Sequence, residues 1–347
     1  MLALRSSRSL PLGALRCDIR ALSANSAVKI FHVAFFLGID GGGTKTRCLL
    51  GDENSALGTG NSTSCKVQRV GEAGAHDALA AAIHEACVQA GISPRQITRT
   101  CAGITGSGRL EIANVMRGLL SSIVGGEIEI IGDVEVGFED AFGSGPGVLV
   151  IAGTGSIAYG RNAAGETARA GGWGHAISDE GSGYSIGLNA VKLVLRLYDA
   201  IGEAPLLRSL MAAMGASGFD DFIVKLNADP QPDYAALFPL IQAEADRGEE
   251  NAISVLRTAG LTLANVTGTV LRRLFAKLDA GSVANRGVRL EDISIATHGG
   301  VLTNSSQLRY GLEFMLRRNF PQVSFLDSGV DPARGALNRA RRSERSS

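Results

Sequence analysis

The chain has 347 residues, and at ~150 residues per domain this length predicts two domains. Its 34 basic and 34 acidic residues leave no formal net charge, which argues against a nucleic-acid partner and against attraction to an anionic membrane. Hydrophobic residues make up 45% and charged residues 20%, so the chain can bury a core, while its apolar runs are shorter than the ~18 residues of a membrane span. We therefore expect a soluble globular protein.

Residues 1–34 differ in composition from the remainder of the chain. Four arginines stand among serines and leucines there, and Asp18 is the single acidic residue. This composition resembles an organellar presequence, and a translated upstream stretch or a disordered tail explains it equally well. We expect the extension to lie outside the fold and the protein to be cytoplasmic, with organellar targeting left open.

The cysteines are odd in number and form no C-x-x-C pair, which indicates a reducing compartment and gives no reason to expect a zinc site. They are Cys17, Cys48, Cys65, Cys87 and Cys101.

From residue 35 the pattern alternates between strand and helix. Strands are predicted over 35–40, 44–50, 99–105 and 127–131, and helices over 75–90 and 111–121. The turn Gly41-Gly42-Gly43 joins the first two strands. This is a hairpin, whereas a Rossmann unit would pass from strand to helix.

The second half of the chain opens with the same sequence of a strand, a glycine-rich turn and a return strand. A strand over 148–152 runs into Gly153-Thr154-Gly155-Ser156 and a return strand over 157–161, and Gly153 lies 113 residues after Asp40 (153 − 40). The repetition suggests a duplicated domain. Helices are predicted over 182–200, 234–247 and 251–278, followed by a strand over 293–297, a helix from about 304 and a last helix over 331–342. We expect domains at 35–145 and 146–342, and the last helix could return to the first of them.

The two glycine-rich turns carry the chemistry. A glycine turn between strands points successive backbone N–H groups at one spot, which suits phosphate oxygens, and Asp40 at its mouth could hold a hydrated Mg²⁺. A single such turn is more often only a tight hairpin. Two of them, facing each other across a cleft, could hold a triphosphate from both sides. The candidate phosphate ligands are Asp40, Gly41, Gly42, Gly43, Thr44, Lys45, Gly153, Thr154, Gly155 and Ser156.

Longer motifs make the resemblance specific. The segments 37–46 and 151–156 resemble the first and second phosphate motifs of the sugar kinase, Hsp70 and actin superfamily, and Thr297-His298-Gly299-Gly300-Val301 resembles its adenosine motif, so that Gly299 and Gly300 are expected at the nucleotide. Gly171-Gly172-Trp173-Gly174-His175, followed by Ser178-Asp179-Glu180-Gly181-Ser182, is similar to N-acetylglucosamine kinases of the BadF/BadG/BcrA/BcrD ATPase family. The resemblance covers residues 35 to about 340.

The resemblance implies an α/β fold of two ribonuclease-H-like (actin-like ATPase) domains with ATP and sugar in the cleft between them. Asp133 then matches the catalytic aspartate that accepts the proton of the sugar hydroxyl. Its alternative is a cap for a helix that begins near Val134. Substrate contacts are implied for Gly106, Thr154, Gly171, Gly172, Trp173 and Asp179; as alternatives, Asp179 could cap the helix at Ser182 and the tryptophan could belong to the core.

One segment departs from the family pattern. Similar kinases place an asparagine after the third strand, where it contacts the sugar. The corresponding loop here reads Asn61-Ser62-Thr63-Ser64-Cys65-Lys66-Val67-Gln68, so that Asn61, Cys65 and Lys66 are alternative occupants of that place. The preference for an N-acetyl group stays open.

The resemblance therefore implies an ATP-dependent kinase of an amino sugar, N-acetylglucosamine being converted to its 6-phosphate, with glucosamine or N-acetylmuramic acid as alternative substrates. A reading of another class is an ATPase that activates a radical dehydratase or reductase. Such activators hold an iron–sulfur cluster on cysteines at a dimer interface, and the sequence offers no suitable cysteine pair. A homodimer is left open.

Overall fold

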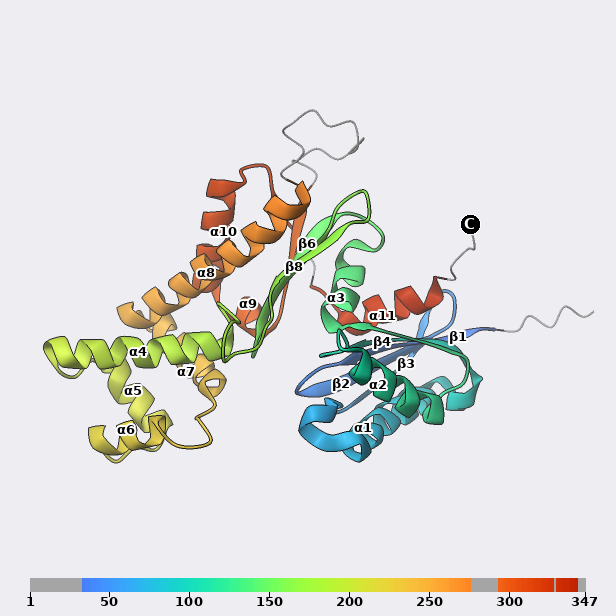
Figure 1. Cartoon of the computed structure of the whole chain (residues 1–347), viewed down its shortest axis with the longest axis horizontal. Coiled ribbons are helices and arrows are strands. Elements are labelled where there is room, and N and C mark those ends of the chain that lie inside the picture. Colours follow the sequence, from blue (N-terminus) through green and yellow to red (C-terminus); the bar gives the residue numbers. More distant parts are fainter. Residues whose placement is uncertain (1–32, 276–292, 328, 343–347) are drawn as a thin grey trace, which may run out of the picture. The chain divides into compact units, whose positions relative to one another are not determined.

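Two five-stranded mixed sheets with one shared topology form the framework of the protein (Figure 1). In each sheet the first strand lies in the centre, the second and third are added antiparallel on one side, and the fourth and fifth are added parallel on the other. The orders are β3-β2-β1-β4-β5 and β8-β7-β6-β9-β10. This repeated order confirms the α/β class with two ribonuclease-H-like domains.

The strands of the first sheet are β1 (Phe35–Gly41), β2 (Lys45–Gly51), β3 (Ala56–Thr63), β4 (Ile97–Ile104) and β5 (Glu127–Gly132). Those of the second are β6 (Gly147–Ala152), β7 (Ser156–Arg161), β8 (Thr167–Gly171), β9 (Ser294–His298) and β10 (Ser324–Phe325).

The structure is a computed structural model that describes residues 33–275, 293–327 and 329–342. The chain divides into residues 1–33 and 34–347, and every element named here belongs to the second unit. The predicted extension lies almost wholly outside the described residues, as do residues 276–278 of the long helix predicted over 251–278.

Three helices belong to the first half of the chain. Helix α1 buries the apolar residues whose spacing of three and four predicts it, among them Leu79 and Ile83, and it packs against β3 and β2. It begins earlier than expected and ends at Gly91, which adopts the left-handed conformation common at helix C-termini. The helices are α1 (Val67–Ala90), α2 (Leu110–Ile123) and α3 (Asp133–Phe142).

The second half contains more helix, as expected. The region predicted as one helix over 234–247 is a short 3₁₀ turn (Tyr234–Leu237) followed by α7, in which Pro239 is an early residue without an N–H to continue a preceding helix. Helices α5 and α6 and strand β8 were not expected. The helices are α4 (Gly183–Ile201), α5 (Pro205–Ala213), α6 (Phe219–Leu226), α7 (Phe238–Asp246), α8 (Glu250–Phe275), α9 (Gly300–Asn304), α10 (Ser306–Asn319) and α11 (Pro332–Arg341).

The last helix packs on the first sheet. Helix α11 lies across β1 and against α3 (Figure 1). It approaches β1 so closely that a Cβ at Gly38 would come within 2.2 Å of the Leu337 backbone nitrogen. Only glycine permits this contact.

Helix α3 contacts both sheets. Val136 belongs to a buried cluster with Cys101 of β4 and Ala336 of α11, whereas Phe138 packs with Leu149 of β6. One short helix therefore links the cores of the two halves.

Charged groups reinforce this connection. The carboxylate of Glu139, on α3, is buried and pairs with Arg161 of β7 and Arg339 of α11, each at 3.3 Å, and with Arg342. A buried carboxylate is costly unless it is paired, so these arginines are needed for its burial. Within the described ranges, no helix is both long and apolar enough to cross a membrane.

Candidate active site

Three side chains of the first sheet lie at the carboxyl ends of neighbouring parallel strands. Asp40 is near the end of β1, Thr105 follows β4 and Asp133 follows β5. The register pairs Ile104 with Gly132, so that Thr105 and Asp133, the next residue on each strand, are neighbours. The Thr105 hydroxyl donates a hydrogen bond of 2.6 Å to Oδ2 of Asp133. The strand order thus gathers residues separated by up to 93 positions (133 − 40) at one edge.

Asp40 is a strongly perturbed carboxyl group. Burial, followed by the nearby negative charge of Asp133, raises its pKa to about 6, while the cations Lys45 and Arg47 act in the opposite direction. Lys45 and Arg47 offset the cost of burying the Asp40 charge only in part, and a bound cation would offset it further.

Asp133 does not occupy the N-cap position that the helix-cap alternative assigns to it. Gly132 occupies the N-cap position of α3, and its backbone N–H donates to Oε1 of Glu135 at 3.1 Å. Asp133 is the first residue of the helix, and its Oδ1 accepts from the backbone N–H of Val134 at 3.0 Å. Both carboxylate oxygens of Asp133 are therefore held.

The first glycine turn rests on a short segment that sequence analysis treated as part of a longer loop. Asn61 lies within β3 and Gln68 within α1, so only residues 64–66 form the connection. The Cys65 side chain is fully buried, and a Cβ at Gly41 would lie 2.8 Å from its sulfur. Cys65 therefore packs against the buried side of the turn at Gly41. Its thiol is not exposed, so we do not retain it among the alternatives for the sugar contact.

Two cationic side chains also border this turn. Nη1 of Arg69, on α1, donates to the carbonyl oxygen of Gly43 at 2.8 Å, and the Lys66 side chain approaches Gly43. Thr44, the last residue of the turn, and Lys45, the first residue of β2, are both exposed. Sequence analysis did not select Arg69, because a lone arginine at the start of a helix carries no signal of its own.

The second glycine turn and the predicted adenosine motif share one edge of the second sheet. Ile151 of β6 pairs with His298 of β9, so Gly153 and Gly299 leave neighbouring strands. Gly299 has φ = +102°, and a Cβ there would lie 2.3 Å from the Ala152 carbonyl oxygen. Gly300 begins α9.

The two edges influence each other electrostatically. Burial, and after it the positive charge of Lys45, lowers the pKa of His298. A residue of the first phosphate motif thus acts on the residue that precedes Gly299.

Asp179 is directed at the second glycine turn. Its side chain is 7% exposed, and a Cβ at Gly155 would lie 2.9 Å from its Oδ2. Burial raises the pKa of Asp179, and hydrogen bonds from the backbone N–H groups of Ser156 and Gly174 partly offset that effect. Asp179 has φ = +69°, a conformation that is uncommon outside glycine and that concentrates at functional sites. It is not the helix cap, because the Ser182 side chain accepts from the Ser185 N–H in that position.

Trp173 is a surface residue. Its side chain is 68% exposed, so the alternative of a core tryptophan is wrong. The guanidinium carbon of Arg169 lies 4.1 Å from the centre of a ring of this indole, and the same guanidinium donates to the carbonyl oxygen of Gly171 at 3.1 Å. Gly171 and Gly172 both have positive φ, which turns the chain sharply after β8. Gly106, with φ = +86°, turns the chain in the same way after Thr105.

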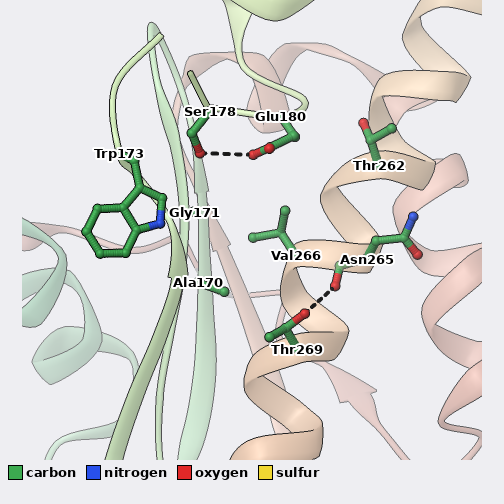
Figure 2. Close-up of a pocket in the computed structure, with 9 residues that line it drawn as sticks. All are labelled: Ala170, Gly171, Trp173, Ser178, Glu180, Thr262, Asn265, Val266 and Thr269. Atoms are coloured by element: carbon green, nitrogen blue, oxygen red, sulfur yellow. Dashed lines mark hydrogen bonds between the residues drawn. The ribbon is translucent and has the colours of Figure 1, made fainter. Parts of the chain in front are cut away.

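An open pocket of about 410 Å³ lies between the end of β8 and one face of α8 (Figure 2). Ser178 and Glu180 line it and are hydrogen-bonded to each other at 3.1 Å, whereas Asp179 between them is directed at Gly155. The pocket contains no residue of either glycine turn. The remaining lining residues are Ala170, Gly171, Trp173, Thr262, Asn265, Val266 and Thr269.

The described residues fit a metal ion that is held mainly by the phosphate groups of a bound nucleotide and only in part by the protein. They include no cluster of three or more histidine, cysteine, aspartate or glutamate side chains that could enclose an ion. Mg²⁺ characteristically takes one or two protein carboxylates and completes its shell with phosphate oxygens and water. Asp40, a carboxylate beside a glycine turn, fits that arrangement.

Fold and site together define a nucleotide-binding protein built from two ribonuclease-H-like halves, each with a glycine-rich turn at the carboxyl edge of its sheet. Residues 37–340 match the family model described as the BadF/BadG/BcrA/BcrD ATPase family. The chain belongs to that family.

Three proteins are similar to this chain over nearly their whole length. An N-acetylmuramic acid/N-acetylglucosamine kinase of Clostridium acetobutylicum is 29% identical over 320 residues, covering 88% of this chain and 98% of the relative. An N-acetyl-D-glucosamine kinase of Dictyostelium discoideum is 28% identical, covering 87% and 96%. The crystal structure of a proposed N-acetylglucosamine kinase from Chromobacterium violaceum superposes with a TM-score of 0.68 at 25% identity, covering 88% and 98%.

Proposed function

We propose that this chain is an ATP-dependent kinase of an amino sugar and that it transfers the γ-phosphoryl group of ATP to the 6-hydroxyl of N-acetylglucosamine. The family and the names of the similar kinases support ATP-dependent sugar phosphorylation. The observation that carries the proposal within this chain is the placement of Asp40 and Asp133 at the carboxyl edge of one sheet, on the ends of β1 and β5 either side of β4, beside the first glycine turn.

Asp133 is the proposed general base. Its carboxylate accepts the proton of the sugar hydroxyl as the oxygen forms a bond to the γ-phosphorus; the bond between that phosphorus and the β–γ bridging oxygen breaks, and ADP leaves with the electron pair. A general base must lie within hydrogen-bond reach of the proton, and it must keep a free lone pair. Each oxygen of Asp133 has one donor in the protein, which leaves lone pairs available.

Backbone and carboxylate groups are proposed to hold the nucleotide. The turns at residues 41–44 and 153–156 present N–H groups to phosphate oxygens, with Lys45 contributing positive charge. Asp40 would hold Mg²⁺, directly or through water, and the ion supplies charge neutralisation on the phosphates. Gly299 and Gly300 are proposed at the adenosine.

Asp179 is the proposed anchor of the sugar. A carboxylate accepts two hydroxyl hydrogen bonds, which fixes the orientation of a pyranose ring. Its position against Gly155 would bring the sugar beside the second phosphate turn. Gly106, Gly171, Gly172, Thr154 and Trp173 complete the proposed substrate contacts.

The described cysteines do not favour the alternative of a radical-enzyme activator. Cys48, Cys65, Cys87 and Cys101 are all buried. A cluster shared between two copies needs cysteines at the surface where the copies meet.

An ADP-release assay with ATP and Mg²⁺ tests the proposal. We expect turnover with N-acetylglucosamine, compared side by side with glucosamine, N-acetylmuramic acid and glucose, and phosphorus–proton coupling to the C6 protons in the product. Asp133→Asn keeps the side-chain shape, and it should lower turnover by about 10²- to 10⁴-fold while ATP affinity stays near that of the wild type.

Asp199→Asn, on the exposed surface of α4, is the matched control and should retain full turnover. Near-normal turnover of Asp133→Asn at ordinary stability would remove the catalytic assignment. Absence of turnover with every sugar in the panel would remove the proposed function itself.

A further inference from the structure

Thr105 makes two hydrogen bonds that join two parts of the proposed active site. Its backbone N–H donates to the carbonyl oxygen of Gly41, in the first phosphate turn, at 3.1 Å. Its hydroxyl donates to Oδ2 of Asp133 at 2.6 Å. One residue therefore contacts both the phosphate turn and the proposed base.

The hydroxyl bond has a definite geometric effect. The terminal torsion of an aspartate side chain has a broad energy well, so the carboxylate plane rotates easily unless it is held. The Val134 N–H holds Oδ1, and the Thr105 hydroxyl holds Oδ2 from the neighbouring strand. With both oxygens fixed, the plane is fixed, and the remaining lone pairs point in set directions.

We propose that Thr105 is a positioning residue for this kinase: it sets the orientation of the Asp133 carboxylate and its distance from the phosphate turn. The inference rests on the proposed function of Asp133. A reaction between a held hydroxyl and a held phosphoryl group is sensitive to small displacements of the base, because the productive geometry is narrow. Thr105 thus affects the chemical step and leaves ground-state binding of sugar and ATP largely unchanged.

The surroundings make Thr105 the side chain best placed for this role. Within the described ranges it is the one side chain whose hydroxyl, amine or amide donates to Asp133. Ser107, two residues further on, donates instead to the Ile131 carbonyl oxygen at 2.7 Å.

Substitution of the hydroxyl alone tests the proposal. Thr105→Val has nearly the same shape and keeps the backbone N–H bond to Gly41 but lacks the donor, whereas Thr105→Ser keeps the donor. A hydrogen bond to a charged group is worth ~1.5–3 kcal/mol, or about 10- to 100-fold in rate. We expect Thr105→Val to lower kcat by about tenfold or more with the KM values of sugar and ATP within about twofold of wild type, and Thr105→Ser to recover most of kcat.

The chain offers a matched control on the same strand. The Thr98 hydroxyl, at the opposite end of β4, donates to the Phe35 carbonyl oxygen at 2.7 Å. Thr98→Val removes a hydrogen bond of similar length far from the carboxyl edge and should leave kcat unchanged. If Thr105→Val does not fold, Thr105→Ala, which also lacks the donor, takes its place, with the melting temperature measured for each variant.

A double-mutant cycle with Asp133→Asn separates positioning from an independent effect. If Thr105 acts through the base, adding Thr105→Val to Asp133→Asn should cost little further kcat. An equal loss in both backgrounds, or wild-type kcat in Thr105→Val, overturns the positioning role while the proposed function stands. Wild-type kcat in Asp133→Asn overturns the assignment of the base, which is a failure of the proposed function and is read from that single variant.

Discussion

Arg334 and Asp140 form a two-point ion pair between α11 and α3. Nε of the guanidinium donates to Oδ1 of the carboxylate at 2.6 Å, and Nη2 donates to Oδ2 at 2.7 Å. Oδ2 also accepts from the Asp331 backbone N–H at 2.7 Å. Asp331 in turn caps α11 and binds Arg47 of β2 at 2.8 Å. The pair thus connects the last helix, the linking helix and the first sheet.

We predict that Arg334→Met destabilises the protein by about 1–3 kcal/mol. The Asp140 side chain is 2% exposed, whereas that of Arg334 is 51% exposed, so the substitution leaves a buried carboxylate with one backbone donor. Glu313→Gln breaks an exposed pair with Arg317 at 3.3 Å, leaves Arg317 over the Phe325 ring, and should cost at most about 0.5 kcal/mol. Urea unfolding of both variants makes the comparison, and equal losses would contradict the special role of the buried carboxylate.

A second prediction concerns the pH dependence of stability at Asp40. Because its pKa is raised from 3.8 to about 6, the folded state binds more protons than the unfolded state between these values. The free energy of unfolding should therefore fall as pH rises through this window. The penalty is complete above about pH 6 and is on the order of 3 kcal/mol.

Asp40→Asn removes that penalty. Without nucleotide, it should be more stable than wild type at pH 8, and the difference should shrink as pH falls toward 4 and vanish near pH 3, where the wild-type carboxyl group is largely neutral in both states. Denaturant titrations of the two proteins from pH 4 to pH 8 measure the difference. A gain in stability that does not change with pH would show that charge burial is not its cause.

A third prediction separates two adjacent glycines. Gly299→Ala places a Cβ 2.3 Å from the Ala152 carbonyl oxygen at φ = +102°, so it should lower the melting temperature by several degrees. Gly300→Ala has no atom nearer than 3.9 Å, in the Asn304 side chain, and should leave the melting temperature within about one degree. Thermal unfolding of the two variants provides the test, and equal melting temperatures would show that the close approach at Gly299 is relaxed in solution.

A fourth prediction follows from the burial of Cys65. Cys65→Ala leaves a small cavity beneath Gly41, so it should lower stability by about 1 kcal/mol and weaken ATP binding. The order of preference among acetylated and free amino sugars should stay the same, because the thiol does not face solvent. The sugar panel measured with wild type and variant decides the matter, and a reordered panel would place Cys65 at the sugar after all.

The sequence by itself predicted the features that depend on residues close together in the chain. The periodicity of Leu79 and Ile83 indicated α1, because apolar spacing of three and four puts one face of a helix on a core. The two glycine turns between strands indicated the duplicated halves, because each hairpin is specified by consecutive residues. The carboxylates Asp40 and Asp133 were selected through motifs.

Only the tertiary structure decided which of these residues meet. Thr105 lies 28 positions before Asp133, and Arg334 lies 194 positions after Asp140; neither pairing has a signal in the spacing of residues. The register between parallel strands sets the first contact, and the docking of α11 on β1 and α3 sets the second. The segment 61–68 was misread for the same reason: Asn61 belongs to β3, and Cys65, although it lies in the connecting segment as expected, is buried. A strand end and a loop read alike along the chain, and only the pairing of β3 with β2 and the packing of residue 65 under Gly41 distinguish them.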